Sequence, residues 1–405
     1  MPGFELFGAD ERKQVNDVLE TGILMRFGFD GARKGIWKAK ELEATISKKF
    51  GCRYTHLVSS GTTALSTVLG ALGIGYGDEV IMPTFTFVAS FESIISVGAL
   101  PVLVDVDDTL TLNPDAVRKA ITPKTKCVMP VHMCGAQADM DSLQQICKEH
   151  NLILLEDACQ STGATYKGKY LGTIGDAGCY SFDFVKIVTC GEGGAIVTNR
   201  EDVYLKSDGF SDHGHDHIGV DRGADLHPYL GYNYRISELH AAVGLAQFSR
   251  IDEFLAKQRA GHSQLKAILA QLPEISFRRV LDEAGDSCTF LSWFLPTTEL
   301  TQAVVAELKA QNAWGGNFYW FDHNWHYIRK WEHLKQGVTL NALHPEYKAA
   351  IMQQANKDFG PSDAVMSRGV STQISLLISE QQIKEKGEKI VAAVKKVLAA
   401  QKISA

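Results

Sequence analysis

The sequence contains no run of about eighteen apolar residues, and its start, MPGFELFGADERKQ, lacks the apolar stretch of a signal peptide. It has no block of lysines and arginines, and its net charge at pH 7 is −6. These absences argue against a membrane-spanning helix, export and nucleic-acid binding. We therefore expect a cytoplasmic protein that binds neither membranes nor nucleic acid.

Other signatures are missing as well. None of the eight cysteines belongs to a CxxC pair, so we expect reduced, packed thiols and no metal site. No GxGxxG motif follows the first predicted strand, and GEGG precedes a strand-like run rather than a helix, which argues against a nicotinamide dehydrogenase. With 405 residues, 45% hydrophobic and 22% charged, the chain has ordinary globular composition and can bury a large core.

Two residues in the sequence are candidates for catalysis. Lys186 lies in CYSFDFVKIVTCGEGG, and Asp157 follows a buried strand-like run in LILLEDACQSTGA. A lysine amine can form a Schiff base with a cofactor aldehyde and move protons, and a carboxylate at the end of a strand can keep a pyridine nitrogen protonated. Singly, Lys186 could be a surface lysine and Asp157 a loop acid or helix cap. Together they indicate a pyridoxal phosphate enzyme.

A possible phosphate site precedes them. The segment THLVSSGTTALSTVLGALG passes from a short strand into a helix-like run with small residues, including Gly61 and Thr62, at its start. Such a start exposes backbone N–H groups to an anion, although the pattern alone is also that of an ordinary N-cap. In PTFTFVAS, Phe85 and Phe87 can either stack on a planar ring or belong to the core.

Strand-like and helix-like segments alternate along the first half of the chain, as in VIMP, TFVASFESIISVG, PVLVDVD and NPDAVRKAI. This alternation predicts an α/β fold with a mainly parallel sheet flanked by helices. Helical spacing from Ile236 to Leu272 then leads to a smaller α/β domain, which an amphipathic helix closes. We expect an N-terminal segment (1–34), a large domain (35–255) and a small C-terminal domain (256–405).

The motifs SSGTTAL, GDEVIMPTFTFVAS, TKCVMPVHMCG, EDACQSTGA, SFDFVKIVTCGEGGAIVTN and GYNYRISELHAAVGLAQ occur in this order. In these motifs the chain resembles the DegT/DnrJ/EryC1/StrS sugar aminotransferases, a family of fold-type-I pyridoxal phosphate enzymes. The resemblance implies pyridoxal 5'-phosphate as cofactor and a homodimer with active sites shared across the interface. It also implies a role for each matching residue: Lys186 as the Schiff-base lysine, Asp157 beside the pyridine nitrogen, Phe87 stacked on the ring, Gly61, Thr62 and Ser181 at the phosphate, Gln160 near the phenolic oxygen, and Asn233 reaching the phosphate of the other subunit.

Further segments are MPGFELFG, the Trp37-Lys38 region, CYSFDFVKIVTCGEGG, FSDHGHDHIGVDRGADLHP and NFYWFDHNWHY. In these the chain resembles the branch of the family that makes 8-amino-3,8-dideoxy-manno-octulosonate, the amino form of the lipopolysaccharide sugar Kdo. This resemblance implies transfer of the amino group of L-glutamate to an 8-oxo Kdo-derived sugar acid, with release of 2-oxoglutarate. A nucleotide-sugar aminotransferase acting on a UDP-, GDP- or dTDP-linked keto-hexose is the alternative. A non-catalytic binding or regulatory protein with this fold is a third possibility, which the intact Lys186 and Asp157 argue against.

Candidates for substrate binding lie in two polar segments. The histidine-rich segment SDHGHDHIGVDRGADLHP contains His215, His217 and Arg222. We favour a sugar-contacting loop over a metal site, and an ordinary polar loop is the alternative. Arg222 and Arg235 are candidate carboxylate clamps or surface arginines. Trp320 and His323 belong to the aromatic run NFYWFDHNWHY, which suits a sugar pocket, a dimer contact or a core.

Overall fold

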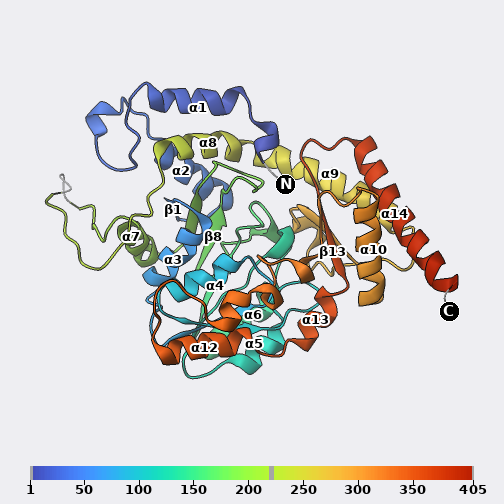
Figure 1. Ribbon diagram of the computed structural model, residues 1–405. Coiled ribbons are helices and arrows are strands. Elements are labelled where there is room, and N and C mark those ends of the chain that lie inside the picture. Colours follow the sequence, from blue (N-terminus) through green and yellow to red (C-terminus); the bar gives the residue numbers. More distant parts are fainter. Residues whose placement is uncertain (1–2, 219–222, 404–405) are drawn as a thin grey trace.

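The computed structural model describes residues 3–218 and 223–403, and a seven-stranded sheet flanked by helices forms its centre (Figure 1). The strand order is β1-β9-β8-β5-β4-β2-β3. All neighbours from β8 to β3 are parallel, whereas β9 runs antiparallel to both β8 and β1. The strands are β1 (Tyr54–Val58), β2 (Glu79–Pro83), β3 (Leu100–Val104), β4 (Thr125–Val128), β5 (Ile153–Asp157), β8 (Ala177–Ser181) and β9 (Gly194–Thr198).

Helices cover both faces of this sheet because successive strand residues point to opposite sides. Met82 packs into one core with α3 and α4, whereas its neighbour Ile81 packs into a second core with α2, α5, α6 and α8. Both residues are fully buried. These helices are α2 (Lys38–Phe50), α3 (Gly61–Ala71), α4 (Val88–Ser96), α5 (Pro114–Ala120), α6 (Met140–His150) and α8 (Glu238–Ser249), and α7 (Glu201–Phe210) packs beside α3 and β1.

A four-stranded antiparallel sheet, in the order β10-β11-β13-β12, forms the second part of the molecule. Trp293 and Val370 pack beneath α9, α10 and α14 in a third core. The elements are α9 (Ile251–Leu269), β10 (Ser276–Phe277), β11 (Phe290–Phe294), α10 (Thr298–Ala310), β12 (Asn317–Phe318), β13 (Gly369–Gln373) and α14 (Glu380–Ile403). The predicted domain boundary near residue 255 falls inside α9, so the division into domains stays a prediction.

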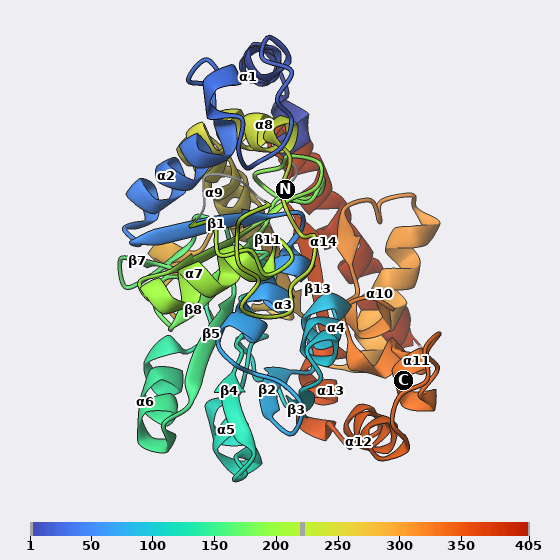
Figure 2. The ribbon, with the colours of Figure 1, turned by 90° about the vertical axis from the view of Figure 1, so that its left-hand side faces the viewer.

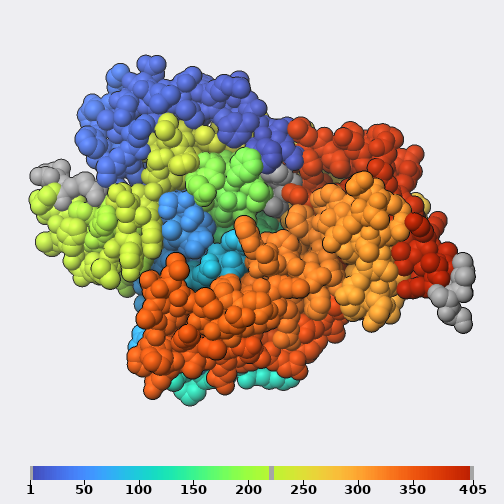
Figure 3. Space-filling view, viewed as in Figure 1, coloured from blue at the N-terminus to red at the C-terminus, as the bar shows by residue number. Residues whose placement is uncertain are grey.

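Two segments cover the outside of this arrangement. Helix α1 (Ala9–Leu19) lies along α8 in both ribbon views (Figure 2), where the buried Glu11 accepts hydrogen bonds from Gln247 (2.7 Å) and Arg250 (2.8 Å). Helices α11 (Glu332–Gln336) and α12 (Pro345–Ala355), drawn in orange, cover the lower front face in Figure 3, and α12 packs against β3. We did not predict the helices of either segment from the sequence.

The helical run predicted from 236 to 272 is divided at Arg250, whose backbone (φ −106°, ψ 11°) lies outside the helical range. Its side chain turns toward the N-terminal segment, where it bonds the Leu6 carbonyl (2.5 Å) and Glu11.

Across residues 3–218 and 223–403, no helix combines the length and the apolar character that crossing a bilayer requires.

Candidate active site

A cavity of about 250 Å³ opens beside the carboxyl ends of β5 and β8. Open α/β sheets place their ligands at this edge. The cavity brings together Gly61, Thr62, Phe87, Asp157, Gln160, Ser181 and Lys186, which are all the predicted cofactor residues except Asn233. Asn233 is exposed and lies opposite Asp212 in an isolated bridge, so its predicted reach into a second subunit stays a prediction.

Asp157 is the last residue of β5 and is 3% exposed. Its two carboxylate oxygens each accept one hydrogen bond, from the Ser90 hydroxyl (2.6 Å) and from the Cys159 N–H (3.1 Å). Ser90 also bonds Thr86 (2.7 Å), which fixes the direction of its own hydroxyl. The carboxylate is thereby held in one orientation and retains lone pairs for a protonated ring nitrogen in the cavity.

The start of α3 forms the opposite end of the cavity. Ser60 caps this helix by accepting the Thr63 N–H (3.0 Å), and Thr63 returns a bond to the Ser60 N–H (2.9 Å). The N–H groups of Gly61 and Thr62 then face the cavity with the positive end of the helix dipole. A Cβ atom at Gly61 would lie 2.7 Å from the Cβ of Ser181, so only glycine allows this approach.

Lys186 lies in the loop between β8 and β9, and its backbone is fixed on both sides. Its N–H donates to the Asp183 carbonyl (3.0 Å), and its carbonyl accepts the Gly3 N–H (2.8 Å). The ring of Phe4 stacks on Phe184 at 4.3 Å, which attaches the N-terminal segment to the same loop. The amine is therefore presented to the cavity from a restrained turn.

The residues present fit pyridoxal phosphate on observations that are independent of the resemblance. An amine and a buried carboxylate face one cavity whose other end is a helix N-terminus that a side chain at Gly61 would block. The aromatic ring of Phe87 lines the same cavity. Amine, carboxylate, aromatic face and anion site are the four contacts that such a cofactor requires.

Trp325 and His326 also line the cavity, although no pattern in the sequence favours them over their neighbours. The Thr86 N–H donates to the His326 carbonyl (3.0 Å) and the Val88 N–H to the Trp325 carbonyl (2.9 Å), so the aromatic run packs against the segment that carries Phe87. Burial lowers the pKa of His326 well below its usual range, and the neighbouring His323 and Lys186 lower it further. His326 is therefore neutral at physiological pH.

The predicted residues Trp320 and His323 lie one layer behind His326. Trp320 is 4% exposed, and its ring stacks on Phe318 at 4.7 Å. His323 contacts His326 through a hydrogen bond of 3.0 Å between their Nδ1 atoms. Neither lines the cavity of its own chain, so a direct contact with sugar stays a prediction for both.

The candidates in the histidine-rich segment form a network away from the cavity. Asp212 bonds both Arg235 and His217, the latter at 2.9 Å, and His217 also bonds Asp208 at 2.6 Å. Burial lowers the pKa of His217, but these two carboxylates outweigh it and raise the pKa to about 9. His215 is buried beside Asp225 at 3.4 Å. Arg222 lies outside the described residues.

The fold and the cavity are those of a fold-type-I pyridoxal phosphate enzyme. More particularly, the chain belongs to the DegT/DnrJ/EryC1/StrS aminotransferase family, which matches residues 7–385. The predicted family, fold class and cofactor are thereby confirmed.

Individual relatives differ in what they cover. The chain is 44% identical to GDP-perosamine synthase of Caulobacter vibrioides over 218 residues, and this match spans 53% of the chain and only 57% of that relative. The solved structure of 3-amino-5-hydroxybenzoic acid synthase is 29% identical, with a TM-score of 0.78 and coverage of 96% of this chain and 97% of the other. An aminotransferase from Psychrobacter cryohalolentis is 26% identical, with a TM-score of 0.81 and coverage of 96% and 98%. None of these relatives supports the expected Kdo-derived substrate.

Proposed function

We propose that the protein is a pyridoxal phosphate-dependent aminotransferase that transfers the amino group of L-glutamate to a keto group of a nucleotide-linked hexose. The observation that carries the proposal is the meeting of Lys186 and Asp157 with the start of α3 in one cavity. When bound, pyridoxal phosphate would supply an aldehyde for amine exchange and a ring that withdraws electrons from the reacting carbon.

The residues of this chain would hold the cofactor, move the proton and keep the ring nitrogen protonated. Lys186 would hold the cofactor at rest and, once an amino donor displaces it, its Nζ would move the proton at the reacting carbon. Asp157, fixed by Ser90 and the Cys159 N–H, would keep the ring nitrogen protonated. Because His326 is neutral, it adds no positive charge beside Lys186.

The charges of the lining support a site completed by a second copy of the chain. Among the described residues that line the cavity, Lys186 is the only lysine or arginine, and Asp183 and Glu192 add negative charge. The carboxylates of glutamate and the phosphates of a nucleotide sugar both require cations or other strong donors. We therefore include in the proposal a homodimer in which Asn233 and Arg235 approach the partner's cavity.

The choice of acceptor rests on the match to GDP-perosamine synthase, whose name denotes a nucleotide-linked amino sugar. The match includes just over half of the chain, so the acceptor is the part of the proposal that most needs a test. The 8-oxo Kdo-derived sugar acid, which we expected from the sequence motifs, is the competing acceptor and stays a prediction.

The test follows the visible spectrum of the purified protein with pyridoxal phosphate. L-glutamate should bleach the band of the lysine-bound cofactor, and a GDP-, dTDP- or UDP-linked keto-hexose should restore it. Restoration by 8-oxo Kdo alone would keep the aminotransferase and replace the acceptor. Failure of the protein to bind pyridoxal phosphate would overturn the proposal and favour a non-catalytic protein.

A further inference from the structure

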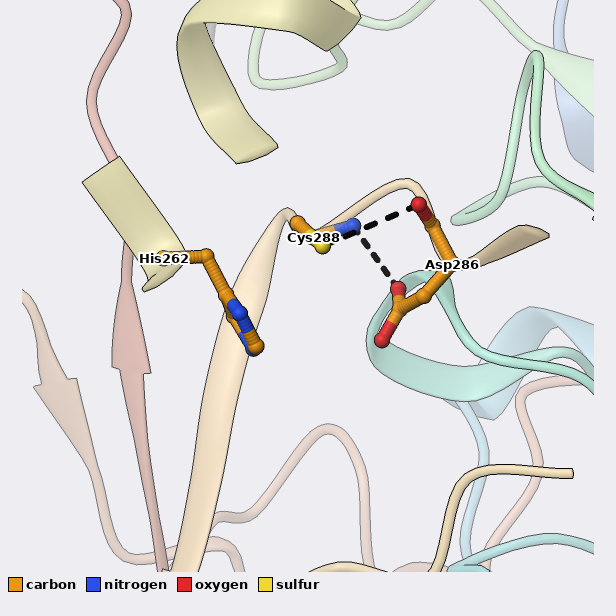
Figure 4. A group of neighbouring side chains, drawn as sticks. All are labelled: His262, Asp286 and Cys288. Carbon is orange, nitrogen blue, oxygen red and sulfur yellow. Dashed lines mark hydrogen bonds between the residues drawn. The ribbon is translucent and has the colours of Figure 1, made fainter. Parts of the chain in front are cut away.

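A second group of reactive side chains lies outside the cavity. His262 on α9 faces Asp286 and Cys288, which precede β11 (Figure 4). One ligand atom from each residue, an imidazole nitrogen, a carboxylate oxygen and the thiol sulfur, lies within 4.8 Å of the other two. In the described part of the chain, no other cluster of three or more histidine, cysteine or acidic residues is close enough to hold a metal ion.

The backbone holds Cys288 in an unusual conformation. Its φ of +59° lies in the left-handed region, which a residue with a Cβ rarely occupies. The Cys288 N–H donates to the Asp286 carboxylate (2.7 Å), and Arg259 donates to the Asp286 carbonyl (3.1 Å). The Cys288 thiol also donates to the Asp286 carbonyl (3.7 Å), so the thiol and the carboxylate are held close together in one turn (Figure 4).

The three side chains also have unused bonding capacity. Among the described residues, the His262 ring makes no hydrogen bond. Burial lowers its pKa, although the nearby Asp286 raises it. Asp286 is 5% exposed, and its carboxylate forms no ion pair with any other described residue. The imidazole nitrogen and the Asp286 carboxylate, which accepts the Cys288 N–H, therefore both have lone pairs available for a cation.

We propose that His262, Asp286 and Cys288 bind a divalent transition metal, zinc foremost, with water in the fourth position. Nitrogen, oxygen and sulfur together are a donor set that zinc accepts in tetrahedral geometry. With bonds of about 2.0 to 2.3 Å, the ligand atoms of such a site lie roughly 3.5 Å apart. Because the three atoms already lie within 4.8 Å of one another, they have to approach by no more than about 1.3 Å.

The charges around Cys288 affect how readily its thiol loses a proton to a metal. Burial raises the pKa of Cys288 to about 12, and the nearby Asp286 raises it too, so zinc has to displace the thiol proton. Arg259 and Lys266 favour the thiolate, whereas Glu283 opposes it. The bound metal would connect α9 to the start of β11.

The experiment uses the cofactor-loaded protein, stripped with a chelator and then equilibrated with zinc. Elemental analysis after gel filtration should find one zinc more per chain than in the variants His262→Ala and Cys288→Ala. Cys52→Ala and His227→Ala are matched controls that remove another buried thiol and a histidine of the histidine-rich segment, and both should retain the metal. An equal zinc content in the two site variants and the wild type would overturn the proposal.

Cobalt gives a measurement on the wild-type chain that does not depend on how the variants fold. A cobalt-thiolate absorption band in the difference spectrum is expected on addition of Co²⁺, and zinc should abolish it. Absence of this band in the wild type would show that His262, Asp286 and Cys288 form only a packed polar cluster. Activity of the aminotransferase enters neither measurement, so the two proposals can fail independently.

Discussion

The substitution Gly61→Ala tests the phosphate end of the cavity. The added Cβ would lie 2.7 Å from the Ser181 Cβ and 3.0 Å from the Cys159 sulfur, whereas ordinary contact begins at 3.4 Å. Both neighbours line the cavity, so either they or the start of α3 must move. Overpacking of this kind costs about 1–3 kcal/mol. If the start of α3 loses its alignment with the phosphate, this cost corresponds to about 5- to 150-fold weaker cofactor binding.

The assay is a titration of the cofactor-free protein with pyridoxal phosphate, followed by absorbance. Gly31→Ala is the matched control, because a Cβ atom there meets nothing within 4 Å and the backbone is not left-handed. It should bind the cofactor as the wild type does. If Gly61→Ala bound pyridoxal phosphate with the affinity of Gly31→Ala, the start of α3 would not be the phosphate site.

Three further predictions address other parts of the account. Asp157→Asn preserves the shape of the side chain but removes its charge. It should slow transamination about 10- to 100-fold, because a charge-assisted hydrogen bond to the ring nitrogen is lost. A near wild-type rate in steady-state assays would exclude Asp157 from this role. Asn233→Ala should weaken cofactor binding in equilibrium dialysis if this residue crosses the dimer, and unchanged affinity would refute that contact. His217 has its pKa raised from 6.5 to about 9, so its pairing stabilises the fold fully below pH 6.5 and this contribution is lost as the pH rises through 9. The melting temperature of His217→Gln should therefore fall below that of the wild type in mild acid and converge with it in alkali, and a difference independent of pH would contradict this reasoning.

Much of the cofactor site could be predicted from the sequence because its residues follow individual strands. Asp157 ends β5, Ser181 ends β8 and Gly61 follows β1, and the carboxyl ends of parallel strands meet at one edge of a sheet. Local patterns that mark strand ends therefore also locate the site.

The remaining residues depend on packing that no local pattern records. His326 reaches the cavity because its segment bonds the backbone beside Phe87, far away in the sequence. Arg235 has the chemistry of a carboxylate clamp, yet Asp212 already binds it within the same chain. His262 and Cys288 meet only because α9 crosses the start of β11, so their spacing in the sequence resembles no metal motif.

The central claim is that Lys186 is the residue that holds the cofactor. Reduction of the protein with pyridoxal phosphate by borohydride, followed by proteolysis and mass spectrometry, identifies the modified lysine directly. We expect one phosphopyridoxyl group per chain, on the peptide that contains Lys186, and none in Lys186→Ala. A modification on another lysine, or a wild-type protein that takes up no cofactor, would contradict the account.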